Sequence, residues 1–141
     1  MNKTKSKYCS CLYYSANALG RIMTKISDEE FAKVGLSSSY AFLLMTVNSK
    51  QGIQPKEISE QMQLTASTVT RLIEKMEYRG YLKRQSCGRS TEVYSTEAGM
   101  AMQDKIKETW QNLYKRYADI LGKDTADKLT ADIYDAALKL E

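Results

Sequence analysis

Apolar residues recur at helical spacing along the first quarter of the chain. Between about residues 7 and 33 they return at intervals that place them along one side of a helix. The apolar positions are Tyr8, Leu12, Leu19, Met23 and Ile26. Gly35 follows this segment, and glycine commonly follows the last residue of a helix. The pattern therefore predicts a long helix that ends before Gly35.

The next segment is apolar on all sides. Ser37 or Ser38 can cap a helix that runs to about Asn48, and its sequence AFLLMTV is too apolar for a solvent-exposed position. We therefore expect this helix at the centre of the fold. Gly52 interrupts the pattern, and Pro55 suits the first turn of a short third helix, PKEISEQM, because proline is favoured at that position.

A fourth helix is predicted after a two-residue turn, Gln63 and Leu64. Thr65 is a suitable N-cap because its hydroxyl oxygen can accept a hydrogen bond from a free N–H of the first turn. The predicted buried face consists of Val69, Leu72, Ile73 and Met76. The opposite face carries Ser67, Thr70, Arg71, Glu74 and Tyr78. Gly80 marks the end of this helix.

Residues 81–96 alternate like strands around the loop QSCGRS, which predicts a β-hairpin with a loose tip. Helical spacing returns from Glu97 to Leu121, and Gly122 stops it. The apolar positions there are Met102, Ile106, Trp110, Leu113, Tyr117 and Leu121. Asp124 can cap a last helix. One side of that helix carries Leu129, Ile133, Ala137 and Leu140.

The first and last helical segments carry apolar stripes. The central part of the chain is too small to bury both of them. Such stripes favour burial against a second subunit. The alternative is that these helices fold back on their own core. A chain of 141 residues with 43% hydrophobic residues can bury one core and is short for two domains, so we expect a single domain over residues 1–141.

The charge is only mildly basic, with a net value of +4 and a pI near 8.9. A nucleic-acid surface therefore depends on where the charges lie rather than on their sum. Lys83, Arg84 and Arg89 fall in one stretch, residues 83–91, that has no acidic residue. The basic excess thus lies in the middle of the chain and in the first seven residues, which contain Lys3, Lys5 and Lys7.

Several classes of protein are disfavoured by composition. No stretch approaches the roughly 20 apolar residues of a membrane helix, and no secretory apolar run follows the first charges, so we expect a cytoplasmic protein. Cys9, Cys11 and Cys87 make a poor disulfide framework and are expected to be reduced. The absence of histidine removes the usual general base and the commonest metal ligand. We therefore expect no enzyme activity, metal or cofactor.

A helix, a short turn, a second helix and a basic hairpin follow one another in the order of a winged helix-turn-helix. Short hydroxyl side chains at the start of the fourth helix allow close approach to phosphates and base edges, where the helix dipole also attracts phosphate. Arg71 projects from the same face and suits either a guanine or a phosphate contact, and Lys75 and Arg79 can reach the DNA backbone.

The predicted hairpin supplies a second set of contacts. Arg89 at its tip suits a narrow minor groove, and Lys83 and Arg84 at its base can neutralise phosphates. The predicted DNA contacts are Thr65, Ser67, Thr68, Thr70, Arg71, Lys75, Lys83, Arg84 and Arg89.

The segment from about Leu36 to Gly99 also carries three motifs: GLSSSYAFLLMTV, KEISEQMQLTASTVTRLIEKMEYRGYLKR and VYSTEAG. Together they resemble the MarR family of bacterial transcription regulators, and STVTRLIEKMEYRGYLKR is the most specific part. The resemblance implies an obligate homodimer, joined through its first and last helices, that binds a palindromic operator and is often released by a small molecule or by oxidation. It puts Ser67, Thr68, Thr70 and Arg71 on recognition-helix positions, and Arg89 on the wing arginine.

Two residues depart from the family pattern. Cys87 stands two residues before the wing arginine, where the family commonly has aspartate. Ser95 stands before the closing threonine, where the family has leucine. Both departures lie in the hairpin and bear on its geometry more than on the fold.

A narrower resemblance concerns CSCLYYSANAL. It is similar to the start of the first helix in the organic-hydroperoxide-sensing branch of the family, which has a reactive cysteine at the position of Cys9. Lys7 and a nearby helix N-terminus meet part of what a reactive thiol needs, so Cys9 is a candidate redox sensor. The alternative is a half-buried, inert thiol. The branch's tyrosine pair is missing, because Ser38 and Ala41 occupy those places.

Four aromatic residues are candidates for a ligand pocket between the dimer helices and the DNA-binding lobe: Tyr13, Tyr14, Trp110 and Tyr114. The alternative is that they belong to the core. The predicted fold is mainly α, with a winged helix-turn-helix lobe at about 36–97 and helical dimerisation regions at about 7–33 and 98–141. The predicted function is a homodimeric DNA-binding repressor, released by a small ligand or by thiol oxidation. The alternative function is a helical protein-interaction adaptor without sequence-specific DNA binding.

Overall fold

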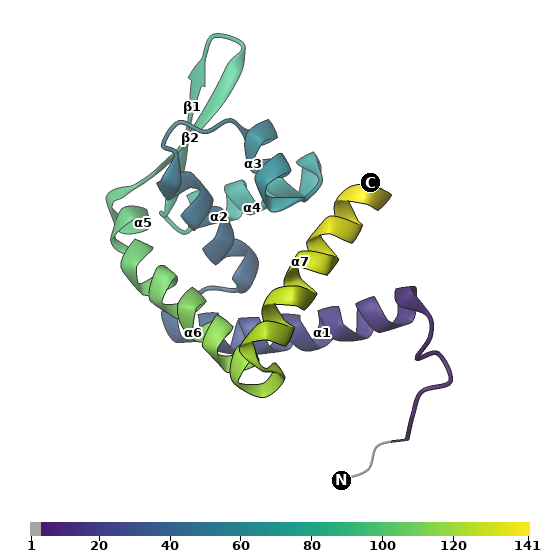
Figure 1. Cartoon of the computed structure of the whole chain (residues 1–141). Helices are drawn as coiled ribbons and strands as arrows, with labels where there is room; N and C mark the ends of the chain where they lie inside the picture. The colour runs from purple at the N-terminus through teal and green to yellow at the C-terminus, as the bar shows by residue number, and fades with distance from the viewer. Residues whose placement is uncertain (1–3) are drawn as a thin grey trace.

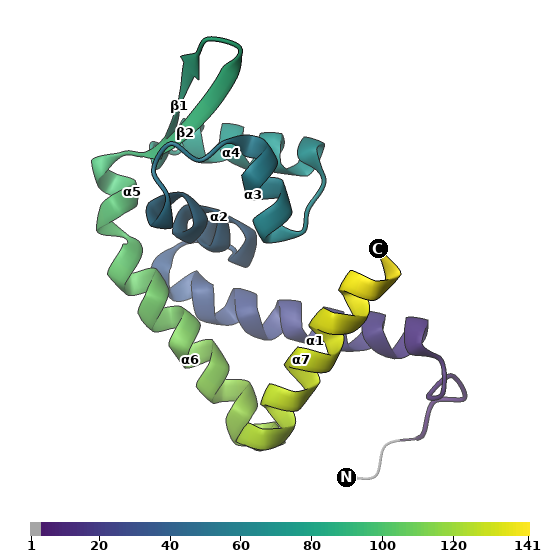
Figure 2. The same cartoon turned by 45° about the horizontal axis from the view of Figure 1, so that its top comes forward.

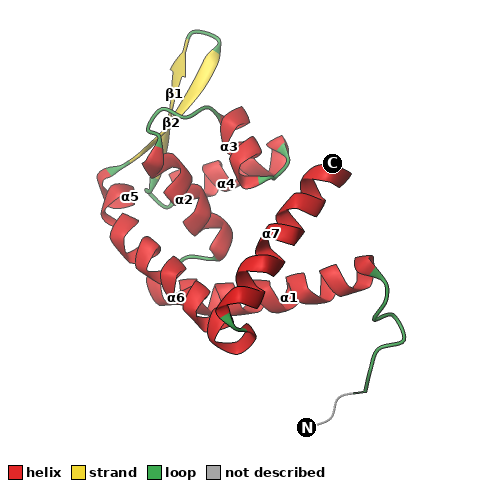
Figure 3. Ribbon diagram, viewed as in Figure 1, coloured by secondary structure: helices red, strands yellow, loops and turns green. Residues whose placement is uncertain are grey.

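A computed structural model describes residues 4–141, so residues 1–3 of the predicted domain lie outside the description. The elements in chain order are α1 (Leu12–Phe31), the 3-10 turn η1 (Ala32–Val34), α2 (Ser38–Ser49), α3 (Pro55–Met62), α4 (Ala66–Tyr78), β1 (Leu82–Cys87), β2 (Ser90–Ser95), α5 (Glu97–Ala101), α6 (Gln103–Leu121) and α7 (Lys123–Leu140). Helices dominate, and the strands form one antiparallel hairpin, hereafter the wing (Figures 1 and 3). The predicted winged helix-turn-helix fold is confirmed.

The second helix lies at the centre of the fold, as its apolar sequence predicts. α2 packs against α1, α3, α4, α6 and β2, and Figure 2 shows it between the helix-turn-helix and the long helices. Leu43, Leu44 and Val47 are fully buried in it. Ile73 and Met76 of α4 reach the same core from the other side. This core holds α4 with its opposite face toward solvent.

The ends of the central helices follow local rules that the sequence shows. Gly35 has φ 77° and ends the first helical segment, in the left-handed region where glycine is unstrained. Pro55 begins α3, and Thr65 caps α4, as predicted. The buried face of α4 consists of the four predicted residues, Val69, Leu72, Ile73 and Met76.

Three predicted boundaries are wrong. α1 begins at Leu12 rather than near residue 7, because the preceding backbone closes turns such as Cys11 N–H to the Tyr8 carbonyl, 2.9 Å. Gly122, not Asp124, is the N-cap of α7. The helix predicted from Glu97 to Leu121 is interrupted at Met102, whose N–H bonds to a carbonyl only three residues back. The interruption separates the short α5 from α6.

The wing has a tight tip, which corrects the loose tip expected from the sequence. The strands pair from Leu82 with Ser95 to Cys87 with Ser90, so only Gly88 and Arg89 remain in the turn. The outer edge of β2 is also paired: Val93 exchanges two backbone hydrogen bonds of 2.9 Å with the loop at residues 52–53. At the base of the wing, β2 is therefore paired along both of its edges. From there the wing projects away from the helices (Figure 1).

The long helices extend beyond the core and leave apolar side chains uncovered. The first half of α1 is almost entirely exposed, and α6 and α7 form a V beside it (Figure 2). The exposed apolar residues of α1 and α7 include Leu12, Tyr13, Tyr14, Ile22, Ile133, Tyr134, Leu138 and Leu140. Within residues 4–141, no helix has the length and apolar character needed to cross a membrane.

Candidate nucleic-acid interface

The start of α4 is fixed by its own hydroxyl groups. Thr65 Oγ1 accepts a hydrogen bond from the backbone N–H of Thr68 at 3.3 Å and donates to Thr68 Oγ1 at 2.9 Å. The cap satisfies one of the N–H groups that a helix leaves free in its first turn. The remaining N–H groups face solvent at the positive end of the helix dipole, where an anion is favoured.

The three predicted hydroxyl residues after the cap, Ser67, Thr68 and Thr70, differ in how freely they can bind. Thr70 Oγ1 donates to the Ala66 carbonyl at 3.0 Å, so its hydroxyl retains only acceptor capacity. Ser67 Oγ has a weak 3.3 Å contact with Thr65 Oγ1 and is exposed. A hydroxyl held that loosely can exchange its contact for a phosphate oxygen. Ser67 is therefore the best placed of these residues to donate to DNA.

Arg71 and Lys75 carry the positive charge of the exposed face of α4. Both are exposed, and within the described chain neither forms an ion pair with a carboxylate. They lie four residues apart, which puts them on the same side of the helix. Glu74 shares that face without pairing to either. This side of α4 therefore offers two free cations to a polyanion.

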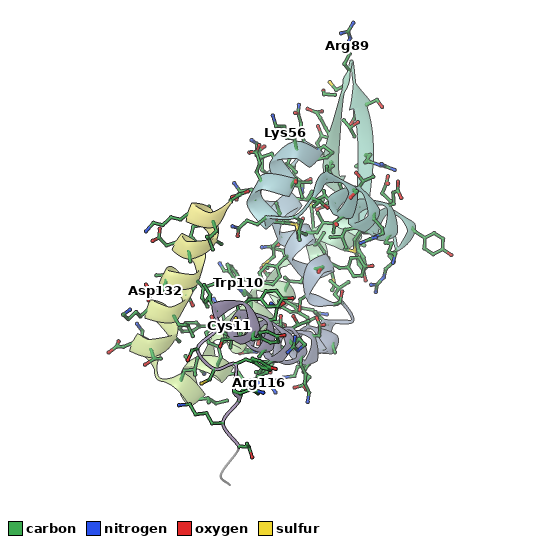
Figure 4. All side chains as sticks on the ribbon, turned by 90° about the vertical axis from the view of Figure 1, so that its right-hand side faces the viewer. Cys11, Lys56, Arg89, Trp110, Arg116 and Asp132 are labelled. Atoms are coloured by element: carbon green, nitrogen blue, oxygen red, sulfur yellow. The ribbon has the colours of Figure 1, made fainter. Side chains whose placement is uncertain are left out.

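The wing offers two further free cations and one that is already paired. Arg89 projects from the tip, farther from the helices than any other labelled side chain (Figure 4). Lys83 at the base is also exposed, and among residues 4–141 neither has a carboxylate partner. Arg84 differs, because its Nε lies 2.8 Å from Glu77 Oε1 of α4. Of the three predicted wing contacts, Arg84 is the one with its charge already balanced.

Two further basic residues lie near this surface: Lys56, which is outside the predicted contacts, and Arg79, which was expected to reach the DNA backbone. Lys56, exposed in the first turn of α3, lies on the same end of the molecule as the wing (Figure 4). Arg79 is directed inward: its guanidinium donates to the Gly35 carbonyl at 3.0 Å and lies 5.6 Å from the Tyr81 ring centroid. Lys56 directly follows Pro55, the first residue of α3. This position in the helix-turn-helix could have identified Lys56 from the sequence as a candidate DNA contact.

The predicted thiol sensor lies outside the helix that was expected to contain it. Cys9 is in the turns before α1 and is exposed, so the half-buried alternative is wrong for the protomer. Its neighbour Tyr8 stacks on Tyr14 with ring centroids 4.6 Å apart. Cys11 and Cys87 are also exposed and free. No group of three or more potential metal ligands gathers among residues 4–141.

The predicted aromatic pocket is only half assembled within one protomer. Trp110 and Tyr114 line a shallow hollow on α6 together with Tyr117. Tyr13 and Tyr14 of α1 are not part of its lining. Tyr114 donates to Asp127 Oδ1 at 2.7 Å, and this bond raises the pKa of its phenol. Neither pair of aromatic residues belongs to the buried core, so the alternative assignment to the core is wrong for the protomer.

Comparisons with known proteins agree with this geometry. The sequence model of the MarR family matches residues 36–90, from the start of the central lobe to the wing tip. The HTH-type transcriptional regulator PapX of Escherichia coli is 28% identical over 109 residues, which span 66% of this chain and 66% of PapX.

Solved structures show the same fold. The transcriptional repressor CouR of Rhodococcus jostii RHA1, bound to a 23-mer DNA duplex, superposes with a TM-score of 0.84 at 20% identity, covering 96% of this chain and 99% of that one. The PcaV regulator of Streptomyces coelicolor, in complex with its natural ligand, also has a TM-score of 0.84, at 14% identity, covering 99% of this chain and 100% of that one.

Proposed function

We propose that this chain is a member of the MarR family and a sequence-specific DNA-binding transcription regulator that acts as a homodimeric repressor. One observation carries the proposal. The exposed face of α4, with Ser67, Arg71 and Lys75, and the wing tip at Arg89 offer free positive charge from two separate elements. A recognition helix and a wing can then engage the major and minor grooves.

Each element has its own role in the proposal. Ser67 and Thr68 approach phosphates or base edges at the start of α4, and Arg71 contacts a guanine or a phosphate one turn later. Lys75 and Lys83 neutralise backbone phosphates, and Arg89 enters the minor groove. Thr65 and Thr70 chiefly stabilise the helix start, because their hydroxyl hydrogens already bond within it.

The exposed apolar residues of α1 and α7 support the homodimer. Leu12 is 69% exposed and Leu140 is 78% exposed, and side chains of this kind are normally buried against a partner when they gather on long helices. A twofold dimer would present two α4 helices to two half-sites about 34 Å apart, which matches a palindromic operator.

Release from DNA is assigned either to a small ligand or to oxidation of Cys9. The hollow at Trp110 and Tyr114 supports the first route, because aromatic walls suit an organic effector and a partner helix could close it. The exposure of Cys9 supports the second route, because oxidants reach an exposed thiol directly. A ligand acts by favouring dimers whose recognition helices no longer match the half-site spacing.

Selection of duplexes from genomic DNA by the purified protein tests the proposal. The enriched duplex is then titrated at several salt concentrations with wild type, Arg71→Ala and the control Lys107→Ala on the exposed side of α6. We expect nanomolar binding of a palindrome, with about tenfold or greater loss in Arg71→Ala and none in the control. Weak binding without sequence preference would sink the operator hypothesis and favour the interaction adaptor.

The two release routes are separated by a second titration. Peroxide is added to wild type and to Cys9→Ser, each bound to the selected duplex. Release of wild type but not of Cys9→Ser assigns the trigger to this thiol. Equal behaviour of the two proteins excludes it and leaves the small-ligand route.

A further inference from the structure

A buried polar contact joins the root of the wing to the central helix. Ser95, the last residue of β2, is only 4% exposed. Its hydroxyl donates a hydrogen bond to Asn48 Oδ1 of α2. Its backbone N–H donates to Gln51 Oε1 at 2.8 Å. The residue where the wing meets the body is thus held by two side chains from one segment.

The same asparagine also bonds to the start of the dimer arm. Asn48 Nδ2 donates to Gln103 Oε1, on the first residue of α6, at 2.9 Å. It also approaches the Gly99 carbonyl of α5 at 3.3 Å. The amide group therefore uses its oxygen toward the wing and its nitrogen toward α5 and α6. A single side chain thus hydrogen-bonds to both the root of the wing and the start of α6.

The packing beside this contact leaves no room for a side chain on Gly99. A Cβ on Gly99 would lie 2.3 Å from the Tyr81 carbonyl oxygen and 3.3 Å from the Ser95 Cβ. Glycine is thus required for α5 to approach the wing root so closely. Met102, where the helix is interrupted, comes three residues after Gly99, and α6 begins at the next residue, Gln103.

A small change at the root is magnified at the tip. A six-residue strand is about 20 Å long, so a tilt of roughly 5° at Ser95 displaces the tip by nearly 2 Å. A hydrogen bond does not survive a lengthening of that size. The angle of the wing therefore decides whether Arg89 reaches its contact. A directional hydrogen bond at Ser95 restricts that angle in a way that an apolar side chain would not.

We propose that Asn48 and Ser95 are positioning residues, which set the angle of the wing on DNA and couple it to α6 through Gln103. This inference rests on the proposed function, because it concerns how Arg89 is delivered to the duplex. The leucine that the family resemblance leads one to expect at position 95 would pack there without forming the bond. The polar joint is thus a feature of this chain's own residues.

A double-mutant cycle tests positioning against simple destabilisation. Ser95→Ala is combined with Arg89→Ala, and the selected duplex is titrated with each protein at a temperature where all are folded. We expect Ser95→Ala to weaken binding about fivefold or more when Arg89 is present, and less than about twofold when Arg89 is absent. Ser86→Ala, an exposed serine on the same hairpin, is the matched control and should leave affinity unchanged.

A second measurement does not depend on DNA. Hydrogen exchange of the free protein should be faster in Ser95→Ala over residues 82–95 and 97–106 and unchanged over α4. Gln103→Ala, at a half-exposed position, removes only the hydrogen bond between Asn48 and α6. It replaces Ser95→Ala in the test if that variant does not fold. It should also weaken DNA binding only when Arg89 is present.

The outcomes separate the inference from the function beneath it. Wild-type binding with equal losses for Ser95→Ala in both backgrounds, or with unchanged hydrogen exchange, overturns the positioning role alone. A wild-type protein that selects no duplex overturns the proposed function, and the inference with it.

Discussion

The Nε of Arg84 lies 2.8 Å from Glu77 Oε1, so the first strand of the wing is bound by an ion pair to α4. Both side chains are partly covered, with 37% and 28% of their surfaces exposed. The pair gives Arg84 a structural contact that Arg89 does not have. Sequence motifs alone would treat the two arginines as equivalent DNA ligands, whereas their surroundings separate them.

This difference predicts unequal effects on DNA binding. Arg89→Ala should weaken operator binding about tenfold and lower the slope of log affinity against log salt by about one, because one phosphate-directed charge is lost. Arg84→Ala should change affinity less than about threefold, because its charge is already balanced by Glu77. Titrations at four salt concentrations measure both quantities. A larger salt effect for Arg84 than for Arg89 would reverse this assignment.

The cap of α4 predicts a separable effect on stability. Thr65→Ala should reduce the free energy of unfolding by about 1 kcal/mol, because the Thr68 N–H loses its acceptor. Thr65→Ser keeps the oxygen and should lie close to wild type. Urea denaturation at fixed protein concentration measures the difference. Identical midpoints for alanine and serine would show that the cap contributes nothing.

Elements that are formed by contacts between residues close in sequence could be predicted, whereas features that depend on contacts between distant residues could not. α4 could be predicted in full, because its cap, turn and buried face depend on residues within one or two turns of each other. The solvent-facing positions of the hydroxyl and basic side chains of α4 followed from the same periodicity. The hydrogen bond from Ser95 to Asn48 spans 47 residues, and no local pattern indicates it.

The wrong boundaries have the same origin. The interruption at Met102 lies three residues after Gly99, which packs closely against the Tyr81 carbonyl, and helical periodicity does not indicate this tertiary contact. The paired state of Arg84 depends on a neighbouring element in the same way. Within one protomer, Tyr13 and Tyr14 do not line the hollow at Trp110, and helical spacing alone does not indicate which aromatic residues share a wall.

The ion pairs between α1 and α6 predict a dependence of stability on acid. Glu30 is buried, and its bond to the Lys33 ammonium lowers the pKa of its carboxyl below the ordinary 4.5, against the opposing effect of burial. Lys33 and Arg116 also lower this pKa through their charges, and Arg116 adds a hydrogen bond. Because the folded pKa is the lower one, the carboxylate stabilises the fold above pH 4.5 and loses this effect as pH falls through the folded pKa.

Glu30→Gln removes this titration and should therefore flatten the acid dependence. The unfolding midpoint of wild type should exceed that of Glu30→Gln by a few degrees at pH 7, and the gap should narrow as the pH falls below 4.5. Thermal unfolding at equal concentration and ionic strength measures both midpoints. A gap that stays constant down to pH 3 would exclude Glu30 as the titrating group. Asp132→Asn, in an exposed pair on α7, is the control and should show little change at any pH.

The uncovered side of α7 predicts where the dimer can be broken. Ile133 is 50% exposed in the protomer, and a glutamate there would bury a charge if this side meets a second copy. In sedimentation velocity at micromolar concentration, wild type should therefore sediment as a dimer of 16.0 kDa chains and Ile133→Glu as a monomer. Lys128→Gln changes the net charge by the same amount on the charged side of α7, away from Tyr134 and Leu138, and should remain dimeric.

A variant that loses the dimer should also bind the operator more weakly. A monomer presents one recognition helix instead of two, so Ile133→Glu should lose at least about a hundredfold in affinity for the palindrome while its affinity for nonspecific duplex changes little. A wild type that sediments as a single chain would contradict the homodimer directly. A dimeric Ile133→Glu would move the interface away from α7, and Leu12→Glu, at a residue 69% exposed in α1, would then decide whether the first helix forms it alone.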